Sequence, residues 1–320
     1  MIRYLLDTGV TNQAGKRKPK KNALKWLASV NDDELAIGVI TLRERLEGAN
    51  VLSKWNPFAE LQTRLQMTWS ILARDRSTGA LGAAVATRFF AVGALAIHVE
   101  GGVAALATQA LINPMYAVLG MPRLRANEPP DSVVEALLAA DAGQAHRQIH
   151  VLDAGGRIAV HTGPECVGWC GSVRAADVSI AGNMLAGPDV VAATLAAFEA
   201  AAGSMAERLL TALEAGEAAG GDKRGKQSAA LKVCTRDPYP DLDIRADDHP
   251  DPLAELRRLH AVSQERFALF RRFLPGADSP CGVFDRVVIE LAISARGTPQ
   301  QCKDVGLGAR RPPGEKPAQQ

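Results

Sequence analysis

The chain has 320 residues, of which 47% are hydrophobic and 22% are charged, the composition of an ordinary globular protein. Its formal net charge of +2 gives no electrostatic reason to expect nucleic acid or a membrane surface as a partner. We recognise no signal peptide, and the longest apolar stretch carries charged residues that a membrane-spanning helix would not tolerate. A cytoplasmic location is therefore the default expectation.

The cysteines indicate no disulfide framework, because their number, five, is odd and their spacing is irregular. Cys166 and Cys170 could be read as half of a metal site, but no second pair with ligand spacing follows them. We therefore interpret them as structural thiols.

Three segments differ in character along the chain. Residues 1–66 contain a short apolar strand, a basic loop and helix-like pieces. Residues 67–272 are rich in alanine and glycine and alternate between strand and helix patterns. Residues 273–320 lose this periodicity and finish in a proline-rich, charged stretch, which is typical of a disordered tail.

The middle segment contains both strand and amphipathic helix patterns. Strands are expected over residues 68–75, 81–88, 90–99, 102–110, 147–152, 157–161 and 227–235, and helices from Asp131, over 188–201, over 204–217 and over 251–273. Ser204 and Glu207 have the spacing of a capping box, which marks one helix start. Runs of strands interrupted by helices predict a layered α+β fold in which sheets lie between helices.

Two polar positions in this segment are candidates for chemistry. The glycine-rich stretch 220–228 contains Asp222 and Arg224, and a loop of this kind suits the carboxylate or phosphate of a ligand. The alternative is a tight connection between a helix and a strand that carries solvated charges. Asn183 could donate a hydrogen bond to an oxyanion, or it could stabilise a turn.

Several runs of the middle segment together resemble a known family. They are Thr68–Asp75, Arg88–Gly93, Ala107–Ala110, Asn113–Tyr116, Arg147–Gln148, Thr162–Gly163 with Cys166, Gly182–Leu185, Gly220–Ala230 and Asp247–Pro252. This segment is similar to the domain of unknown function 1028 family, which is grouped with the N-terminal-nucleophile (Ntn) hydrolases. The resemblance implies a four-layer αββα sandwich over residues 67–272 and hydrolysis of an amide bond.

The mechanism that the resemblance implies would act through Thr68. A threonine hydroxyl is a weak nucleophile, but the free α-amine of a first-residue threonine can take its proton, since the reference pKa of that amine is ~7.7–8.0. Here Met67 precedes Thr68. Three alternatives stand: the true start is Met67, the chain cleaves itself at the Met67–Thr68 bond, or the protein is inactive. We favour the first, and the structural alternative is a β-branched residue that opens a strand.

Under this interpretation we expect the following roles, of which those of Asn183, Asp222 and Arg224 are assigned from polarity and loop position. Thr68 would be the nucleophile and the carrier of the base, Asn183 would contribute to the oxyanion site, and Asp222 with Arg224 would orient the amine or bind substrate. The expected partner is a small-molecule amide. No cofactor is expected, and a homo-oligomer is among the expected assemblies.

Residues 1–66 resemble the first half of a different family. Tyr4–Thr8, Trp26–Ala28, Asp32–Leu35, Val39–Leu42 and Glu44 are similar to PIN-domain nucleases of the VapC toxin type. The resemblance implies Mg²⁺-dependent RNA cleavage, with Asp7 and Glu44 as two of several carboxylate ligands. Gly9 stands where that family usually has asparagine, and the second half of the domain has no counterpart. We interpret the segment as an incomplete PIN-like α/β remnant; a ribonuclease and a non-catalytic fold relic are the alternative functions.

Overall fold

The computed structural model describes residues 4–6, 35–37, 68–221 and 225–294. The chain divides into two compact units, Met1–Leu65 and Gln66–Gln320. In the first unit, strand β1 (Tyr4–Leu6) pairs in parallel with strand β2 (Leu35–Ile37). The two metal-ligand candidates of this unit, Asp7 and Glu44, lie outside the described residues.

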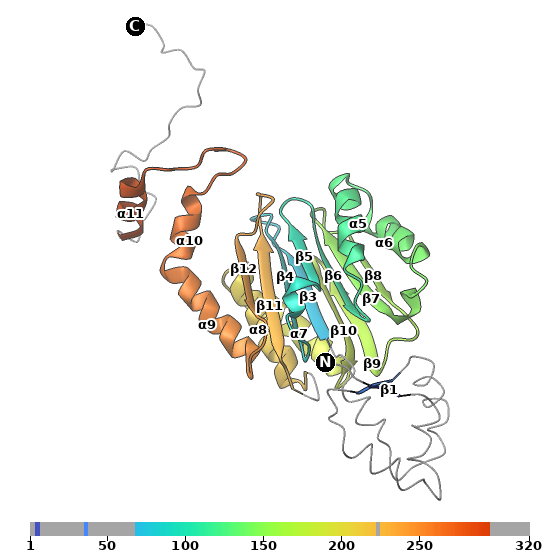
Figure 1. Ribbon diagram of the computed structural model, residues 1–320. Coiled ribbons are helices and arrows are strands. Elements are labelled where there is room, and N and C mark those ends of the chain that lie inside the picture. The colour runs from blue at the N-terminus through green and yellow to red at the C-terminus, as the bar shows by residue number, and fades with distance from the viewer. Residues whose placement is uncertain (1–3, 7–34, 38–67, 222–224, 295–320) are drawn as a thin grey trace, which may run out of the picture. The chain divides into compact units, whose positions relative to one another are not determined.

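The second unit is built on two antiparallel sheets (Figure 1). The six-stranded sheet has the order β12-β11-β4-β3-β10-β9, from β3 (Thr68–Arg74), β4 (Leu81–Thr87), β9 (Trp169–Ala175), β10 (Val178–Leu185), β11 (Ser228–Cys234) and β12 (Leu242–Ala246). The four-stranded sheet has the order β5-β6-β7-β8, from β5 (Ile97–Glu100), β6 (Ala104–Ala110), β7 (Arg147–Asp153) and β8 (Ile158–Thr162).

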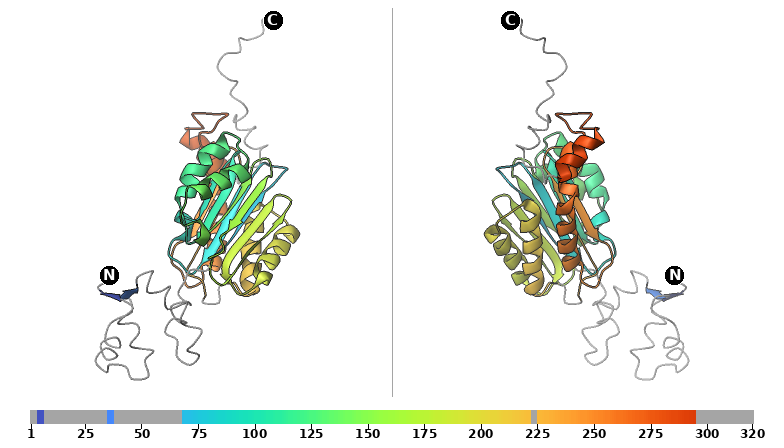
Figure 2. Two further views of the ribbon diagram at one scale, coloured as in Figure 1. Left: turned by 90° about the vertical axis from the view of Figure 1, so that its right-hand side faces the viewer. Right: turned by 90° about the vertical axis from the view of Figure 1, so that its left-hand side faces the viewer.

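Helices cover the outer faces of the two sheets (Figure 2). Helices α5 (Met115–Arg125) and α6 (Pro130–Ala139) pack on the four-stranded sheet. Helices α7 (Pro188–Ala200), α8 (Met205–Ala218) and α9 (Pro252–Glu265) pack on the six-stranded sheet. The remaining helical segments are η3 (Val92–Ala94), η4 (Gln144–His146), α10 (Phe267–Phe270), η5 (Arg271–Phe273) and α11 (Arg286–Ser294).

The alternation of side chains along a strand decides which layer each residue joins. In β3, Trp69 and Ile71 belong to the hydrophobic cluster under α7, α8 and α9, whereas Leu72 belongs to a second cluster between the two sheets. A third cluster lies between the four-stranded sheet and α5 with α6. Each fully buried leucine, isoleucine or valine stabilises the fold by about 1.5–3 kcal/mol relative to an exposed one, so these three layers carry most of the stability.

The mixed α+β class with antiparallel sheets and helices is confirmed. Ser204 caps α8 as expected: its hydroxyl accepts from the Glu207 amide at 3.3 Å, and the Glu207 carboxylate accepts from the Ser204 amide at 2.7 Å. In the described parts of the chain, no helix combines the length and the apolar character needed to cross a membrane.

The structure differs from the sequence expectation at several elements. Residues 90–99 do not form one strand, because Ala91 adopts a left-handed backbone with φ of 51° and η3 follows it. The long helix expected to residue 273 ends at Glu265. Asp131 lies within the first turn of α6 rather than at its cap. Residues 273–294, expected to belong to a disordered tail, include helix α11.

Candidate functional site

Thr68 stands in a row of four polar residues that crosses the six-stranded sheet. Register pairs Ser228 with Thr87, Thr87 with Thr68, and Thr68 with Asn183. All four are buried, and Thr68 is 5% exposed. The Thr68 and Thr87 hydroxyl oxygens lie 3.1 Å apart, at hydrogen-bonding distance. Residues opposite each other in an antiparallel pair point to the same face of the sheet. The four side chains therefore form a polar row on the face that is turned towards the other sheet.

A second polar row on the four-stranded sheet meets the first. Register pairs Gln109 with Gln148 and Gln148 with Thr162. The Asn183 side-chain amide joins the rows, since it donates to the Thr68 carbonyl and to Gln148 Oε1, both at 3.3 Å. The space between the sheets therefore has one polar end, which contains Thr68, beside an apolar remainder that contains the cluster of Leu72.

The orientation of the Gln148 amide follows from its partners. Its Nε2 lies 3.2 Å from the Gly171 carbonyl and 3.0 Å from the Gly182 carbonyl, and carbonyl oxygens only accept hydrogen bonds. Gln148 therefore points its nitrogen at these strands and its oxygen at the Gln109 Nε2 group, 2.7 Å away. The Gln109 side-chain oxygen is then left as an acceptor.

This orientation fixes the protonation of a buried histidine. Ser70 donates its hydroxyl hydrogen to Gln109 Oε1 at 2.6 Å, so Ser70 accepts a hydrogen bond from His150 Nε2 at 2.9 Å. His150 Nδ1 then carries no hydrogen and accepts from the Ser179 hydroxyl at 2.9 Å. We infer that His150 is the neutral tautomer protonated at Nε2.

Burial explains why this histidine stays neutral. His150 has no exposed surface, and desolvation of the charged form lowers its pKa to about 3. With its Nε2 hydrogen directed at Ser70, the ring cannot take the Ser70 proton. The His150–Ser70 pair thus orders the interior and is not a serine–histidine catalytic pair.

Three of the five non-glycine residues with positive φ in the described chain lie at or beside the polar end of the interior. Ala91, Ala110 and Met184 have φ values of 51°, 66° and 55°. Ala110 directly follows Gln109 of the second row, and Met184 directly follows Asn183 of the first. A left-handed residue with a side chain costs roughly 1–2 kcal/mol, and such strain is concentrated at functional sites. The surrounding packing therefore holds both rows in a fixed arrangement.

A carboxylate holds the loop that follows β6. Asp141 Oδ2 accepts hydrogen bonds from Tyr116 at 2.7 Å, from Asn113 at 2.9 Å and from Arg147 at 3.0 Å. The Arg147 bond, joined by the others, keeps the pKa of Asp141 far below its usual value. Burial first, and the neighbouring Asp141 second, raise the pKa of Tyr116. We assign this cluster a structural role, because the ionised Asp141 already accepts hydrogen bonds from these three side chains.

The structure brings together two of the four predicted site residues. Thr68 and Asn183, far apart in sequence, are hydrogen-bonded neighbours. Asp222 and Arg224 lie outside the described residues. The end of their loop is described: the Gln227 amide donates to the Thr87 carbonyl at 2.8 Å, beside the first row.

The polar residues of the second row, and those hydrogen-bonded to His150, were not predicted as site residues. Ser70, Gln109, Gln148 and His150 occupy alternate positions in otherwise apolar strands. Thr68-x-Ser70 and Gln148-x-His150 are therefore period-two signals of polar groups on one strand face. In the described part of the chain, no group of three or more histidine, cysteine or acidic residues is arranged to hold a metal ion.

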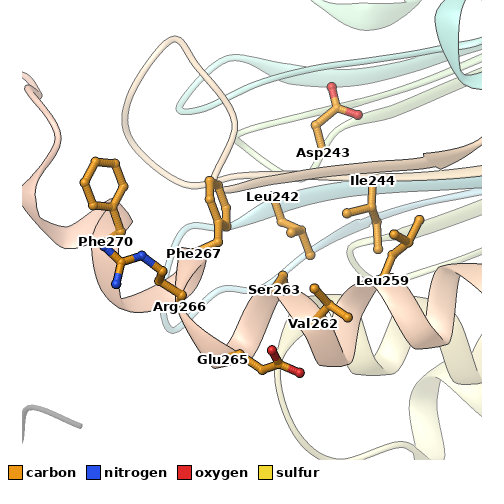
Figure 3. Close-up of a pocket in the computed structure, with 10 residues that line it drawn as sticks. All are labelled: Leu242, Asp243, Ile244, Leu259, Val262, Ser263, Glu265, Arg266, Phe267 and Phe270. Carbon is orange, nitrogen blue, oxygen red and sulfur yellow. The ribbon is translucent and has the colours of Figure 1, made fainter. Parts of the chain in front are cut away.

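A groove of about 500 Å³ lies elsewhere, between β12 and the α9–α10 helices (Figure 3). Leu242 and Ile244 from β12 face Val262 and Phe267 across it. Its polar lining side chains are Asp243, Ser263, Glu265 and Arg266. No residue of either polar row lines this groove, so we do not assign the chemistry of Thr68 to it.

The fold and the buried rows define an α+β domain with a threonine-centred polar interior between two antiparallel sheets. Residues 68–256 match the model of a family described as a family of unknown function, DUF1028. This match spans more than half of the chain, and the chain belongs to the DUF1028 family.

A solved structure supports the same assignment. The chain is similar to the crystal structure of protein SPO2555 from Silicibacter pomeroyi, a DUF1028 protein, with 33% sequence identity and a TM-score of 0.64. The similarity covers 68% of this chain and 100% of that chain. No curated protein matches the chain.

Proposed function

We propose that the second unit is an Ntn-type amidohydrolase whose nucleophile is Thr68 and whose substrate is a small amide. The observation that carries the proposal is the place of Thr68: it opens β3 within the first polar row, and Asn183, which joins the two rows, donates to its carbonyl. The layer order, helices outside two facing antiparallel sheets, is the arrangement that such a hydrolase would have. A merely structural threonine would not require a buried asparagine amide directed at its backbone carbonyl.

The proposed chemistry begins with a free amine on Thr68. The neutral amine takes the hydroxyl proton as Oγ1 attacks the substrate carbonyl carbon, and the resulting tetrahedral species carries the charge on the former carbonyl oxygen. Collapse breaks the carbon–nitrogen bond, and the ammonium of Thr68 returns its proton to the leaving amine. Water then attacks the ester, and the acid product leaves Thr68 in its starting state.

This chemistry requires cleavage of the peptide bond between Met67 and Thr68. An amide nitrogen has no basic lone pair and cannot take the hydroxyl proton. In the intact chain the Thr68 side chain is also almost fully buried. The proposal therefore assigns activity to the form that begins at Thr68 and none to the uncleaved chain.

The hydrogen bonds of Asn183 support a positioning role. Its Nδ2 group contacts the Thr68 carbonyl and Gln148 Oε1, so the amide nitrogen faces the backbone of the proposed nucleophile. To serve the oxyanion, Asn183 would exchange one of these bonds for the substrate oxygen. Asp222 and Arg224 stay in the proposal as substrate-binding residues on a loop whose end borders Thr87.

The test compares two forms of the protein. Mass spectrometry identifies the N-terminal residue of the full chain and of a chain that starts at Met67, and both are then screened against a panel of small amides. We expect hydrolysis only from the form that begins at Thr68. Thr68→Ala should abolish turnover, and Thr68→Ser should retain part of it.

A matched control is Thr78→Ala, which removes a threonine hydroxyl from an exposed turn and should leave turnover unchanged. Equal turnover by an uncleaved full-length chain would refute the mechanism. Full turnover by the Thr68→Ala variant would do so as well.

One observation keeps a second candidate for the first unit. β1 and β2 pair in parallel, as two strands of a PIN-like nuclease sheet would. Such a nuclease would hold Mg²⁺ between Asp7 and Glu44 and further carboxylates. We expect no RNA cleavage, because the resembled family's other carboxylates have no counterpart. Mg²⁺-dependent cleavage by the full chain that Asp7→Asn abolishes would establish this second activity.

A further inference from the structure

Strand β12 is one edge of the six-stranded sheet. It pairs with β11 on one side, and within the described ranges no strand pairs with its other side. An unpaired edge presents backbone N–H and C=O groups in a row, and a further strand can add to it. The edge takes no part in the proposed hydrolysis, because neither polar row includes a residue of β12.

The side chains of β12 alternate between an apolar and a charged face. Leu242 and Ile244 point towards α9, whereas Asp243 points away from it (Figure 3). Arg245 shares the face of Asp243, because strand side chains alternate. A Cβ on Gly93 would lie 2.8 Å from the Arg245 Cδ, so this charged face is turned towards η3. Each face of β12 therefore has one character along its length.

Both charged side chains of β12 keep surface for a second partner. Asp243 pairs with Lys232 at 2.9 Å and stays 32% exposed. Arg245 pairs with Asp247 at 3.4 Å and stays 41% exposed. Their ion pairs within the chain therefore leave part of each charge open to another molecule.

The order of charges along β12 complements its own reverse. Suppose that a second β12 runs antiparallel, with Ile244 opposite Ile244 of the second copy. Asp243 then lies opposite Arg245 of the second copy, and the same pair recurs on the other side of the axis. Opposite charges at directly opposed positions stabilise a strand pair, and like charges destabilise it. Moving the axis to Asp243 or to Arg245 would set like charges against each other, so one register fits both charged positions.

We propose that β12 pairs antiparallel with β12 of a second copy of this chain, about a twofold axis at Ile244. The two six-stranded sheets then join into one continuous sheet. Because a twofold axis produces every contact twice, the interface contains two ion pairs between Asp243 and Arg245. The apolar faces of the two strands meet on the side of α9.

The helices beside β12 supply the rest of the interface. Five residues of strand span about 17 Å, and a sheet layer is about 10 Å thick, so the edge alone presents on the order of 170 Å² per copy. Stable interfaces bury about 800 Å² per partner. Val262, Phe267 and Phe270 line the groove beside β12 and are 45%, 43% and 38% exposed. The twofold axis places the grooves of both copies on the same face of the joined sheet, where these side chains extend the contact.

The experiment measures the mass of the full chain by sedimentation velocity over a dilution series. We expect a reversible dimer. Asp243→Arg sets arginine against arginine at both pairs, and Arg245→Asp sets aspartate against aspartate. Each single variant should raise the dimer Kd by about ten-fold or more. A mixture of the two variants should restore association, because every arginine of one variant then lies opposite an aspartate of the other.

The matched control is Arg174→Asp, which reverses an exposed charge on β9, the strand at the opposite edge of the same sheet. This variant should leave the Kd unchanged. Circular dichroism checks that each variant folds. A wild-type chain that stays monomeric would overturn the proposal, and so would a dimer that both single variants retain or a mixture that fails to associate.

A cysteine at the axis tests the register without a change of charge. In either type of antiparallel pair the Cα atoms of opposed residues lie about 4.5–5.5 Å apart, which is within the range of a disulfide. Ile244→Cys should therefore link two copies through position 244 under mild oxidation, as mapped by mass spectrometry. Linkage only through the exposed Cys281 would contradict the proposed axis.

Discussion

The buried histidine makes a quantitative prediction about stability and pH. His150 has a pKa of about 3 in the folded protein and an ordinary pKa of ~6.5 in the unfolded chain. Between these values the unfolded chain binds a proton that the folded protein does not, so stability is full above about pH 6.5 and falls as the pH drops towards 3. At pH 5, which lies ~1.5 units below the unfolded pKa, the loss is about 2 kcal/mol at ~1.36 kcal/mol per unit.

The perturbation that tests this is His150→Gln. A glutamine amide can donate to Ser70 and accept from Ser179. It therefore preserves the donor and acceptor order of these hydrogen bonds without a titratable ring. The assay is urea unfolding of the wild type and the variant at pH 7 and pH 5. From pH 7 to pH 5 the wild type should lose about 2 kcal/mol more free energy of unfolding than the variant, whatever the variant's stability at pH 7.

Other titrating groups contribute equally to both proteins, so they cancel in this difference of differences. Equal slopes against urea for the two proteins would show that the same surface unfolds. An excess loss below about 0.5 kcal/mol would refute the reasoning, because it would mean that the folded interior accepts the proton or that the ring is not desolvated.

Three further predictions rest on other features. Nitrogen NMR of labelled histidine should find the His150 ring neutral at pH 5 with its hydrogen on Nε2. A hydrogen on Nδ1 would contradict the assigned directions of the hydrogen bonds between His150, Ser70 and Gln109. Ser204→Ala should lower the free energy of unfolding by about 1 kcal/mol in urea titrations through loss of the capping box, whereas a neutral result would show that the cap contributes nothing. Gly93→Ala should cost about 1–3 kcal/mol, since its Cβ would lie 2.2 Å from the Ala230 Cβ, and an unchanged melting temperature would show that η3 shifts freely.

The sequence was informative where a local pattern decides the structure. Thr68 to Arg74 alternates between two buried faces, so the strand and its place as the first of the domain were predictable. The capping box of Ser204 was predictable because its two hydrogen bonds lie within one turn. The resemblance to the family singled out Thr68, and polarity and position in the sequence singled out Asn183, but neither showed that the two residues are hydrogen-bonded.

Helices α5 and α11 and strands β9, β10 and β12 were not predicted, and for α5 and β10 the reason is identifiable. Helix α5 contains Pro122 and exposes Val118 and Leu119 while it buries Tyr116, so apolar residues on both sides conceal the helical period. Strand β10 buries Ser179 and Asn183 between the sheets, and polar residues beside Gly182 are more typical of a turn than of a buried strand.

The polar interior could not be assembled from the sequence, because it depends on register and on the meeting of two sheets. Ser70 and His150 are 80 residues apart, and Gln148 and Asn183 are 35 residues apart. Single polar residues at such separations look like strand ends or caps. Only the pairing of β3 with β10, and the packing of that sheet on β7, reveals one continuous network.

The register of the first row also sets when the site can form during synthesis. Thr68 needs Asn183, which follows it by 115 residues, and the turn around Val92 needs Ser228, which follows by 136 residues. A ribosome adds roughly 5–20 residues per second, so the first strand waits several seconds for its neighbours. Any cleavage of the Met67–Thr68 bond that relies on these contacts can therefore occur only after most of the chain has been synthesised. An aminopeptidase that trims an exposed nascent end would act before them, and pulse-labelled nascent chains would distinguish the two routes by the length at which Thr68 first becomes the N-terminus.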